Sequence, residues 1–241
     1  MTKQSPGLSP GLFYMRISLM TFDAIIFDCD GVLVDSEILG LDVSTAYLQS
    51  HGLDWSPADL VRLFTGLRDD VFAERLTEHY RARHGVAPRP GFFEGLVAVR
   101  RARRHLLKPV PGAERALSAL RPPLAVASSS RQEILFGKMK RTGLFDYFEP
   151  HVYSAELVDA GKPAPDIFLY AAKALGADPA RCLVIEDSAN GVKAGIAAGM
   201  TVWGFLGGGH CFKGHGARLI AAGAARNVDD YASLTALLQN A

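Results

Sequence analysis

Short apolar runs alternate with amphipathic, helix-like stretches from Thr21 onward, and this alternation restricts the fold more than any other feature. The runs are brief and partly β-branched, as strands buried on both faces of a parallel sheet should be. The segments expected to form strands are Ala24–Phe27, Leu124–Ala127, Cys182–Ile185, Thr201–Phe205 and, more weakly, His151–Tyr153. Strands that alternate with helices build a parallel sheet covered on both sides. The sequence therefore predicts an α/β fold with a doubly wound parallel sheet.

Proline, glycine and asparagine mark the expected ends of the helices between these strands. Pro165 stands where a helix should begin, and Gly176 stands where it should end. Asn190 is expected to cap the following helix, which Gly199 would close. These boundaries place a helix between successive strands, as a doubly wound sheet requires.

Residues 37–108 interrupt the alternation, because they show helical periodicity without a strand-like run. Ser56, which is followed by a proline and an acid, has the pattern of a helix start, and Gly85 has that of a helix end. We therefore predict a helical cap domain at residues 37–108, inserted into a core that comprises residues 21–36 and 109–241. The two junctions would act as hinges.

Composition excludes several kinds of partner. The formal net charge of the 241 residues is +1, so no overall field attracts the chain to nucleic acid or to a membrane surface. No apolar run approaches the roughly 20 residues that span a bilayer. The three cysteines are widely spaced, form no zinc motif and fit a reducing, cytoplasmic setting. Residues 1–20 lack the pattern of a signal peptide and are expected to form a flexible extension.

Polar side chains follow the expected strands at the points where the strands end. The set comprises four carboxylates, two hydroxyls and an ammonium group, namely Asp28, Asp30, Glu186, Asp187, Ser128, Ser129 and Lys162. The carboxyl ends of parallel strands meet at one edge of a sheet, and ligands bind beyond that edge. We therefore expect these side chains to form one site.

The chemistry of this set indicates phosphate esters and a hard cation. Clustered carboxylates suit Mg²⁺, which prefers oxygen ligands. Backbone N–H groups, a serine hydroxyl and a lysine can bind phosphate oxygens. Asp28 could attack a bound phosphoryl group and form an acyl phosphate. Asp30, two residues further on, could serve first as acid and then as base.

Four segments in this order resemble the motifs of haloacid dehalogenase-like phosphatases. They are residues 27–37, which include Asp28-Cys29-Asp30-Gly31, then Ser128, then Lys162 within Gly161-Lys162-Pro163, and finally Glu186-Asp187-Ser188. The resemblance extends across residues 21–240 and implies a Rossmann-like core. Within the family, the helical insert resembles the cap of the phosphoglycolate phosphatase and β-phosphoglucomutase branch. The opening motif is similar to that of phosphogluconate-phosphatase-like members.

The resemblance implies a role for each carboxylate. Asp28 would be the nucleophile and a metal ligand. Asp30 would be the acid and base, with its backbone carbonyl on the metal. Asp187 would be a direct metal ligand, and Glu186 would be either a further ligand or a partner of the ligands. The cofactor implied is Mg²⁺.

The resemblance also implies contacts with the substrate. Ser128, Ser129 and Lys162 would hold the phosphoryl group. Arg68 and Arg131 are possible substrate contacts. Arg68 stands one residue earlier than the corresponding arginine of the β-phosphoglucomutase pattern, and Arg131 could equally be solvated.

Two histidines lie in a glycine-rich loop after the strand expected at Thr201–Phe205. Both His210 and His215 are expected to face solvent. The alternative for His210 is a place at the mouth of the site.

The sequence thus predicts a Mg²⁺-dependent phosphatase that acts on a small phosphorylated metabolite, a sugar or sugar-acid phosphate, through an aspartyl-phosphate intermediate. A monomer or weak oligomer is expected. One alternative is a phosphomutase of the same architecture. Another is a dehalogenase or phosphonate hydrolase, which Asp30 disfavours because related enzymes of those kinds lack an acid and base there. The third is a non-catalytic metabolite-binding protein, a class that would tolerate the loss of Asp28.

Overall fold

A parallel sheet forms the centre of the molecule, a computed structural model in which residues 22–65 and 67–239 are described. The sheet has six strands in the order β3-β2-β1-β4-β5-β6. These are β1 (Ala24–Phe27), β2 (Leu124–Ser128), β3 (Val152–Ser154), β4 (Cys182–Glu186), β5 (Thr201–Phe205) and β6 (Arg226–Val228). The strand order reverses beside β1, which is the topological switch point of a doubly wound fold. The predicted fold class is confirmed, whereas the extension expected at residues 1–20 lies outside the described residues.

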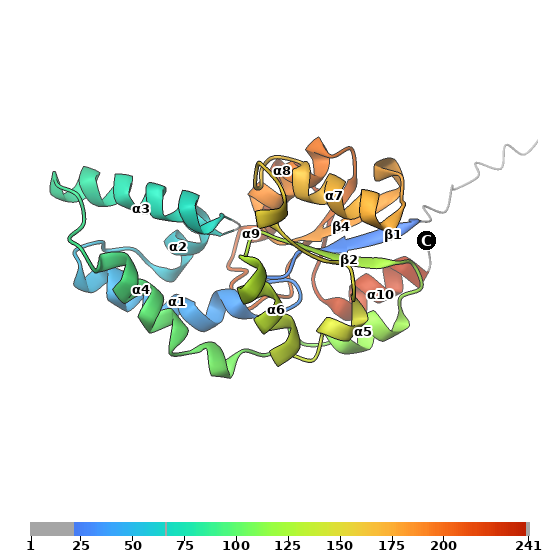
Figure 1. Cartoon of the computed structure of the whole chain (residues 1–241), viewed down its shortest axis with the longest axis horizontal. Coiled ribbons are helices and arrows are strands. Elements are labelled where there is room, and N and C mark those ends of the chain that lie inside the picture. Colours follow the sequence, from blue (N-terminus) through green and yellow to red (C-terminus); the bar gives the residue numbers. More distant parts are fainter. Residues whose placement is uncertain (1–21, 66, 240–241) are drawn as a thin grey trace, which may run out of the picture.

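The alternation of side chains along each strand divides the core into two apolar layers. Ile25 and Phe27 pack on one face of the sheet, and Ala24 and Ile26 pack on the other. Helices on the first face are α5 (Ala113–Ala119), α6 (Gln132–Arg141) and α10 (Tyr231–Gln239). Helices on the second face are α7 (Asp166–Leu175), α8 (Ala189–Ala197) and α9 (His215–Ala221). Figure 1 shows α7 and α8 on the opposite side of the strands from α5 and α10.

One strand was not expected from the sequence. β6 pairs with β5 at the edge of the sheet, and its residues are Arg226, Asn227 and Val228. Only Val228 is buried. An edge strand with polar side chains lacks the apolar run that marks a strand buried on both faces.

The start of α8 corrects another expectation. Its N-cap is Ser188, whose Oγ accepts a hydrogen bond from the N–H of Gly191 at 3.0 Å, so the capping role expected of Asn190 is wrong. Ser188 has the extended backbone of a cap residue, with φ −113° and ψ 146°. Ser188, the residue immediately after Asp187, therefore caps the helix, which begins at Ala189. The ends predicted at Gly85 and Gly176 are confirmed, since both are left-handed C-cap residues with φ of 73° and 67°.

A helical lobe extends to one side of the sheet (Figure 1). It contains α1 (Ser36–Ser50), α2 (Pro57–Phe64), α3 (Asp69–His84) and α4 (Phe92–Arg101), which surround an apolar cluster of their own. Short 3₁₀ turns elsewhere are Arg104–Leu106, Phe145–Tyr147, Ala155–Leu157 and Pro179–Arg181. None of the described helices is long and apolar enough to cross a membrane.

The two segments that join the lobe to the sheet lie side by side. Val34 and Pro109 form an antiparallel bridge. The N–H of Asp35 donates to the carbonyl of Lys108 at 3.1 Å, and that of Val110 donates to Leu33 at 2.9 Å. A paired crossing of this kind fits a hinge. The division into a separate cap at residues 37–108 stays a prediction.

Ser56→Ala is expected to reduce the stability of the lobe. Ser56 Oγ accepts from the N–H of Asp59 at 3.2 Å, while the N–H of Ser56 donates to Asp59 Oδ2 at 3.1 Å, so α2 begins with the predicted capping box. Loss of this cap should lower the free energy of unfolding by about 1 kcal/mol in urea titrations. Ser118→Ala, in the exposed part of α5, is the matched control and should change it little. Equal effects of the two changes would contradict the capping role.

Candidate active site

Lys162 draws two carboxylates together at the carboxyl edge of the sheet. Its Nζ donates to Asp28 Oδ1 at 2.5 Å, to Glu186 Oε1 at 2.7 Å and to the carbonyl of Ala127 at 3.0 Å. Its side chain is only 1% exposed. β1, β2 and β4 are neighbours in the sheet, so residues at their ends can meet around one ammonium group. The structure thus brings together residues that lie more than a hundred positions apart.

The electrostatics of this group are dominated by burial and by an excess of negative charge. Burial raises the pKa of Asp28 well above its usual range; Lys162 opposes that rise, whereas Glu186, Asp187 and Asp30 add to it. Burial lowers the pKa of Lys162, but Asp28 and Glu186 outweigh that effect and raise it overall. One ammonium group therefore does not balance the carboxylates around it.

The carboxylates fit a divalent cation. Asp28, Glu186 and Asp187 are all buried, and each offers an oxygen within 4.8 Å of the others. Hard carboxylate oxygens are the ligands that Mg²⁺ and similar ions prefer. A cation placed among them would offset the repulsion that raises the pKa of Asp28.

Glu186 accepts hydrogen bonds at both of its carboxylate oxygens. Its Oε1 accepts from Lys162, and its Oε2 accepts from the N–H and the hydroxyl of Ser188 at 2.7 and 2.9 Å. A Cβ placed on Gly191 would lie 1.6 Å from Glu186 Oε1, so the start of α8 presses directly on this side chain. Of the two roles expected for Glu186, this arrangement fits that of a partner that holds Lys162 and the Asp187 loop.

Asp30 is held by side chains that the sequence did not assign to the site. Its Oδ1 accepts from Ser36 and from the ammonium of Lys138, and its Oδ2 accepts from Ser130 Oγ at 2.8 Å. Lys138 also donates to Ser130 Oγ at 3.0 Å. Burial raises the pKa of Asp30, but Lys138 and the hydrogen bonds from Ser36 and Ser130 outweigh it, and the pKa is lowered overall. The carboxylate is thus ionised and fixed.

A sequence signal for Lys138 exists. It lies in α6 between the buried residues Leu135 and Met139, three positions after the first and one before the second. A lysine so close to the apolar face of a helix either extends its ammonium group to solvent or pairs with an anion, and here it pairs with Asp30. The signal alone does not decide between these two or say which anion is the partner.

The two serines expected to bind phosphate lie at the end of β2. Ser128 is 1% exposed, and its Oγ accepts from the N–H of Ser130 at 3.1 Å. Ser129 is half-buried beside it. Both lie close to the Lys162 contact, because Ala127, the residue before them, accepts from Lys162. Their role in phosphate binding stays a prediction.

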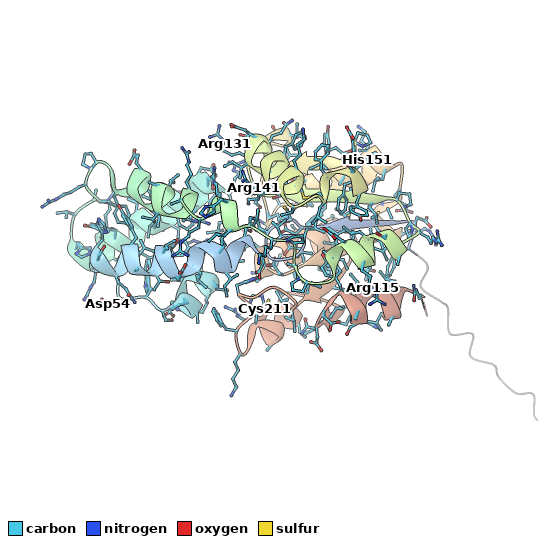
Figure 2. All side chains as sticks on the ribbon, turned by 90° about the horizontal axis from the view of Figure 1, so that it is seen from below. Asp54, Arg115, Arg131, Arg141, His151 and Cys211 are labelled. Carbon is cyan, nitrogen blue, oxygen red and sulfur yellow. The ribbon has the colours of Figure 1, made fainter. Side chains whose placement is uncertain are left out.

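The two arginines considered as substrate contacts differ in placement. Arg131 has a side chain that is 66% exposed and is bound to Glu156 at 3.1 Å, on the outer surface in Figure 2, as its solvated alternative requires. Arg68 is bound by Asp70 through two hydrogen bonds of 2.8 and 2.5 Å. A Cβ on Gly161 would lie 3.4 Å from Arg68 Cδ, so Arg68 reaches from the lobe to the loop that carries Lys162.

The expectation that His210 and His215 face solvent is wrong. His210 is 0% exposed and His215 is 4% exposed. His210 Nε2 lies 2.8 Å from Asp187 Oδ2. The loop can fold this closely because Gly208 has no Cβ. A Cβ at that position would lie 2.5 Å from the carbonyl of Gly31. The available signal was a run of glycines before a histidine at the carboxyl end of a strand, the same edge that carries the other site residues.

The fold and these contacts define a class of protein. A parallel α/β sheet places a buried carboxylate–lysine pair, an acidic cluster and serine hydroxyls at its switch point. This set of groups is typical of enzymes that act on phosphate esters with the help of a divalent cation.

Comparisons with known proteins agree with that class. The family model of haloacid dehalogenase-like hydrolases matches residues 22–199. The 6-phosphogluconate phosphatase of Escherichia coli (strain K12) is 29% identical over 185 residues, which cover 76% of this chain and 82% of that protein. A haloacid dehalogenase-like protein from Agrobacterium tumefaciens has 34% identity and a TM-score of 0.82, over 90% of this chain and 98% of that one. A hydrolase from Deinococcus radiodurans, solved with bound phosphate and sodium, has 36% identity and a TM-score of 0.75, over 92% and 100%.

The chain therefore belongs to the haloacid dehalogenase-like hydrolase family, and within it to the phosphoric monoester hydrolases.

Asp28→Asn is expected to change how stability depends on pH. The folded protein holds a proton on Asp28 more tightly than the unfolded chain, whose aspartates titrate near about pH 3.9. The effect of Asp28 on stability is therefore most favourable below that value and is lost as pH rises through the raised pKa. In metal-free buffer, wild-type stability should fall relative to Asp28→Asn as pH increases.

Urea titrations over a range of pH, with EDTA and then with Mg²⁺, measure this difference. Mg²⁺ should reverse the trend in the wild-type protein, because a cation binds the deprotonated carboxylate of the folded state. A stability difference that does not vary with pH in EDTA would show that Asp28 has an ordinary pKa.

Proposed function

We propose that this chain is a Mg²⁺-dependent phosphatase that hydrolyses a sugar or sugar-acid phosphate through an aspartyl-phosphate intermediate. The observation that carries the proposal is the buried contact between Asp28 and Lys162, with Asp187 close beside it. A lone buried carboxylate would be a poor anion-binding site. Paired with an ammonium group and a cation, the same carboxylate can approach a phosphate group.

Asp28 acts as the nucleophile. Its carboxylate attacks phosphorus, a bond forms between aspartyl oxygen and phosphorus, and the bond from phosphorus to the substrate oxygen breaks. Lys162 stands 2.5 Å from Asp28 Oδ1, where it stabilises negative charge that develops on the transferred group. Ser128 and Ser129 add hydroxyl donors at the end of β2.

Asp28, Asp187 and the backbone carbonyl of Asp30 would hold the cation. When bound, Mg²⁺ would supply positive charge that offsets the negative charges of the nucleophile and the phosphoryl group. Glu186 keeps Lys162 and the Asp187 loop in place through the bonds described above.

Asp30 moves the protons. It gives one to the leaving alcohol and then takes one from the water that hydrolyses the aspartyl phosphate. In the free protein Asp30 is an ionised carboxylate bound by Lys138, Ser36 and Ser130. It has to exchange these partners for the substrate oxygen, and separation from Lys138 raises its pKa so that it can carry a proton.

The helical lobe supplies the substrate contacts. Arg68 already reaches the loop of Lys162, and closure of the lobe would exclude bulk water from the intermediate. The substrate class is supported by the similarity to a 6-phosphogluconate phosphatase.

The main alternative is a phosphomutase, in which a sugar hydroxyl rather than water attacks the aspartyl phosphate. A mutase has to retain and reorient its intermediate, which demands closely fitted contacts from the lobe. Arg68 departs by one residue from the β-phosphoglucomutase pattern and is bound by Asp70. Hydrolysis needs only that water reach the intermediate. A non-catalytic binding protein is disfavoured because Asp28 and Asp30 are both present.

A screen of phosphorylated metabolites tests the function directly. Release of inorganic phosphate from sugar and sugar-acid phosphates should require Mg²⁺, stop with EDTA and be lost in Asp28→Asn. The same reactions should be followed for isomerised sugar phosphate. Isomerisation that outpaces phosphate release would establish the mutase alternative, and full activity in EDTA would exclude the metal. Binding without turnover of any substrate would favour a binding protein.

Asp30→Asn is expected to lower turnover by about 10²-fold or more, because the shape is kept and proton transfer is lost. Mg²⁺ binding, measured by calorimetry, should survive, since the backbone carbonyl is unchanged. Asp23→Asn is the matched control: Asp23 is exposed, pairs with Arg181 and precedes β1 at the opposite edge of the sheet. Near-normal turnover in Asp30→Asn would place the acid and base elsewhere.

A further inference from the structure

The loop at residues 206–214, between β5 and α9, contacts three separate parts of the molecule. His210 Nε2 lies 2.8 Å from Asp187 Oδ2. The N–H of Gly209 donates to Asp35 Oδ1 at 3.1 Å, at the point where the chain leaves the sheet for the lobe. Phe212 packs against the apolar cluster of the lobe. The loop is therefore braced on either side of His210.

The imidazole of His210 is enclosed as well as braced. A Cβ on Gly31 would lie 1.9 Å from Asp187 Oδ2 and 2.5 Å from His210 Cε1. One on Gly208 would lie 2.8 Å from His210 Cε1. Only glycines at these positions allow the loop after β1, the imidazole and the carboxylate to pack so closely. With 0% exposure, the ring is also shut off from solvent.

The side chain of His215 contacts the backbone carbonyl of the same aspartate. Its Nε2 lies 2.5 Å from the carbonyl of Asp187, and its Nδ1 lies 2.8 Å from Arg218 Nη2. Arg218 can only donate, so His215 Nδ1 accepts this hydrogen bond. His215 Nε2 then carries the hydrogen and donates it in a hydrogen bond to the carbonyl of Asp187. The ring of His215 stands nearly perpendicular to that of His210, at 87° with centroids 5.3 Å apart. Two imidazoles thus fix the carbonyl and the carboxylate of one residue.

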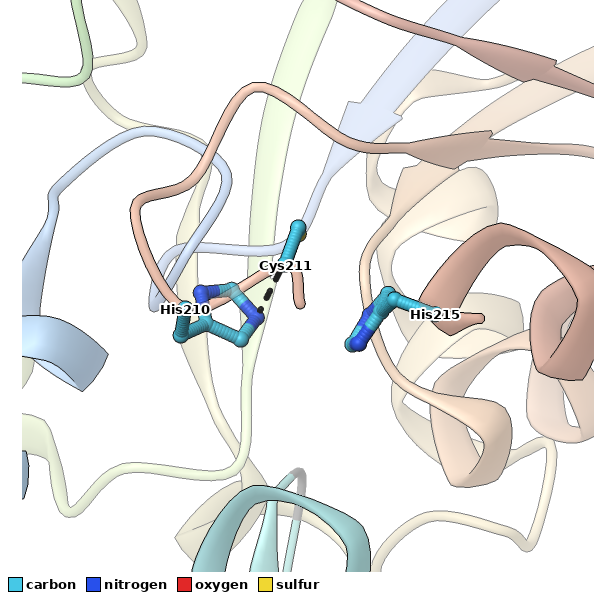
Figure 3. Close-up of side chains that lie close together, drawn as sticks. All are labelled: His210, Cys211 and His215. Carbon is cyan, nitrogen blue, oxygen red and sulfur yellow. Dashed lines mark hydrogen bonds between the residues drawn. The ribbon is translucent and has the colours of Figure 1, made fainter. Parts of the chain in front are cut away.

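The same histidines could be taken for a soft-metal site, because Cys211 lies beside them (Figure 3). Zinc would need a lone pair from each side chain. Both ring nitrogens of His215 are already in hydrogen bonds, and His210 Nε2 lies within ion-pair distance of Asp187 Oδ2. Cys211 Sγ makes only long contacts of 3.8 Å, to His210 Nε2 and to the carbonyl of Phe205. These contacts favour an arrangement around Asp187 over a second metal site.

We propose that His210 is a positioning residue that sets the Asp187 carboxylate for the divalent cation. Fixing Oδ2 against a braced and enclosed imidazole fixes the rotation of the carboxylate plane, and therefore where Oδ1 stands. A ligand oriented in advance binds an ion without first losing rotational freedom. The inference rests on the proposed role of Asp187 as a metal ligand.

Direct binding of Mg²⁺ and Mn²⁺ without substrate tests this, by calorimetry and by electron paramagnetic resonance. His210→Ala should raise the Kd by about 10- to 100-fold, as is typical when a side chain that orients a metal ligand is lost. His210→Gln keeps an N–H near the position of Nε2 and should recover most of the affinity. Lys213→Ala, at an exposed position of the same loop, is the matched control and should bind as the wild-type protein does.

A double-mutant cycle separates the role of His210 from a general loss of structure. In an Asp187→Asn background, His210→Ala should cost little further affinity, because its target has already gone. His210→Ala that binds Mg²⁺ as tightly as wild type, or His210→Gln that is folded by circular dichroism yet no better than His210→Ala, would overturn the inference. Tight binding of Zn²⁺ that is lost in Cys211→Ser would replace it with the soft-metal site. A wild-type protein that binds no Mg²⁺ would refute the proposed metal site itself.

Discussion

The contact of one buried ammonium group with two buried carboxylates organises this molecule. Lys162 can lie at the end of the sheet only because Asp28 and Glu186 offset the cost of burying its charge, and neither carboxylate could be buried there without it. Ser188 and Gly191, which follow β4, close around Glu186. Asp187 lies between them and β4. The sheet supplies the geometry, but this charge group decides which loops must converge on it.

Much of this arrangement follows from the sequence because it depends on local pattern and on topology. Runs such as Ala24–Phe27 and Thr201–Phe205 have the length and composition of buried parallel strands, and the structure has strands with these same bounds. Parallel strands carry their ends to one edge, so Asp28, Lys162 and Glu186 could be expected to meet without any knowledge of side-chain positions. The roles of these residues remain predictions about chemistry.

What the sequence did not reveal depends on contacts between distant segments. The partner of Lys138 is Asp30, 108 positions away, and no periodicity specifies that distance. His210 looked like a solvated loop residue, because a run of glycines is also the composition of a flexible loop. Here the glycines serve close packing against Gly31 instead, which is visible only once both loops are placed. Ser188 and Asn190 are both good caps, and the end of β4 decides between them.

Phe212 has a mechanical consequence. It belongs to a loop that follows β5, but its partly buried ring packs against the apolar cluster of the helical lobe. The lobe is therefore contacted at a further place besides the two paired segments around Val34 and Pro109. With the paired segments as the predicted hinge, the contact of Phe212 with the lobe would oppose rotation away from the arrangement seen here. If the lobe rotates, either Phe212 leaves the apolar cluster of the lobe or the loop moves together with the lobe. Because the loop also carries His210, movement of the loop with the lobe would change the contact between His210 and Asp187.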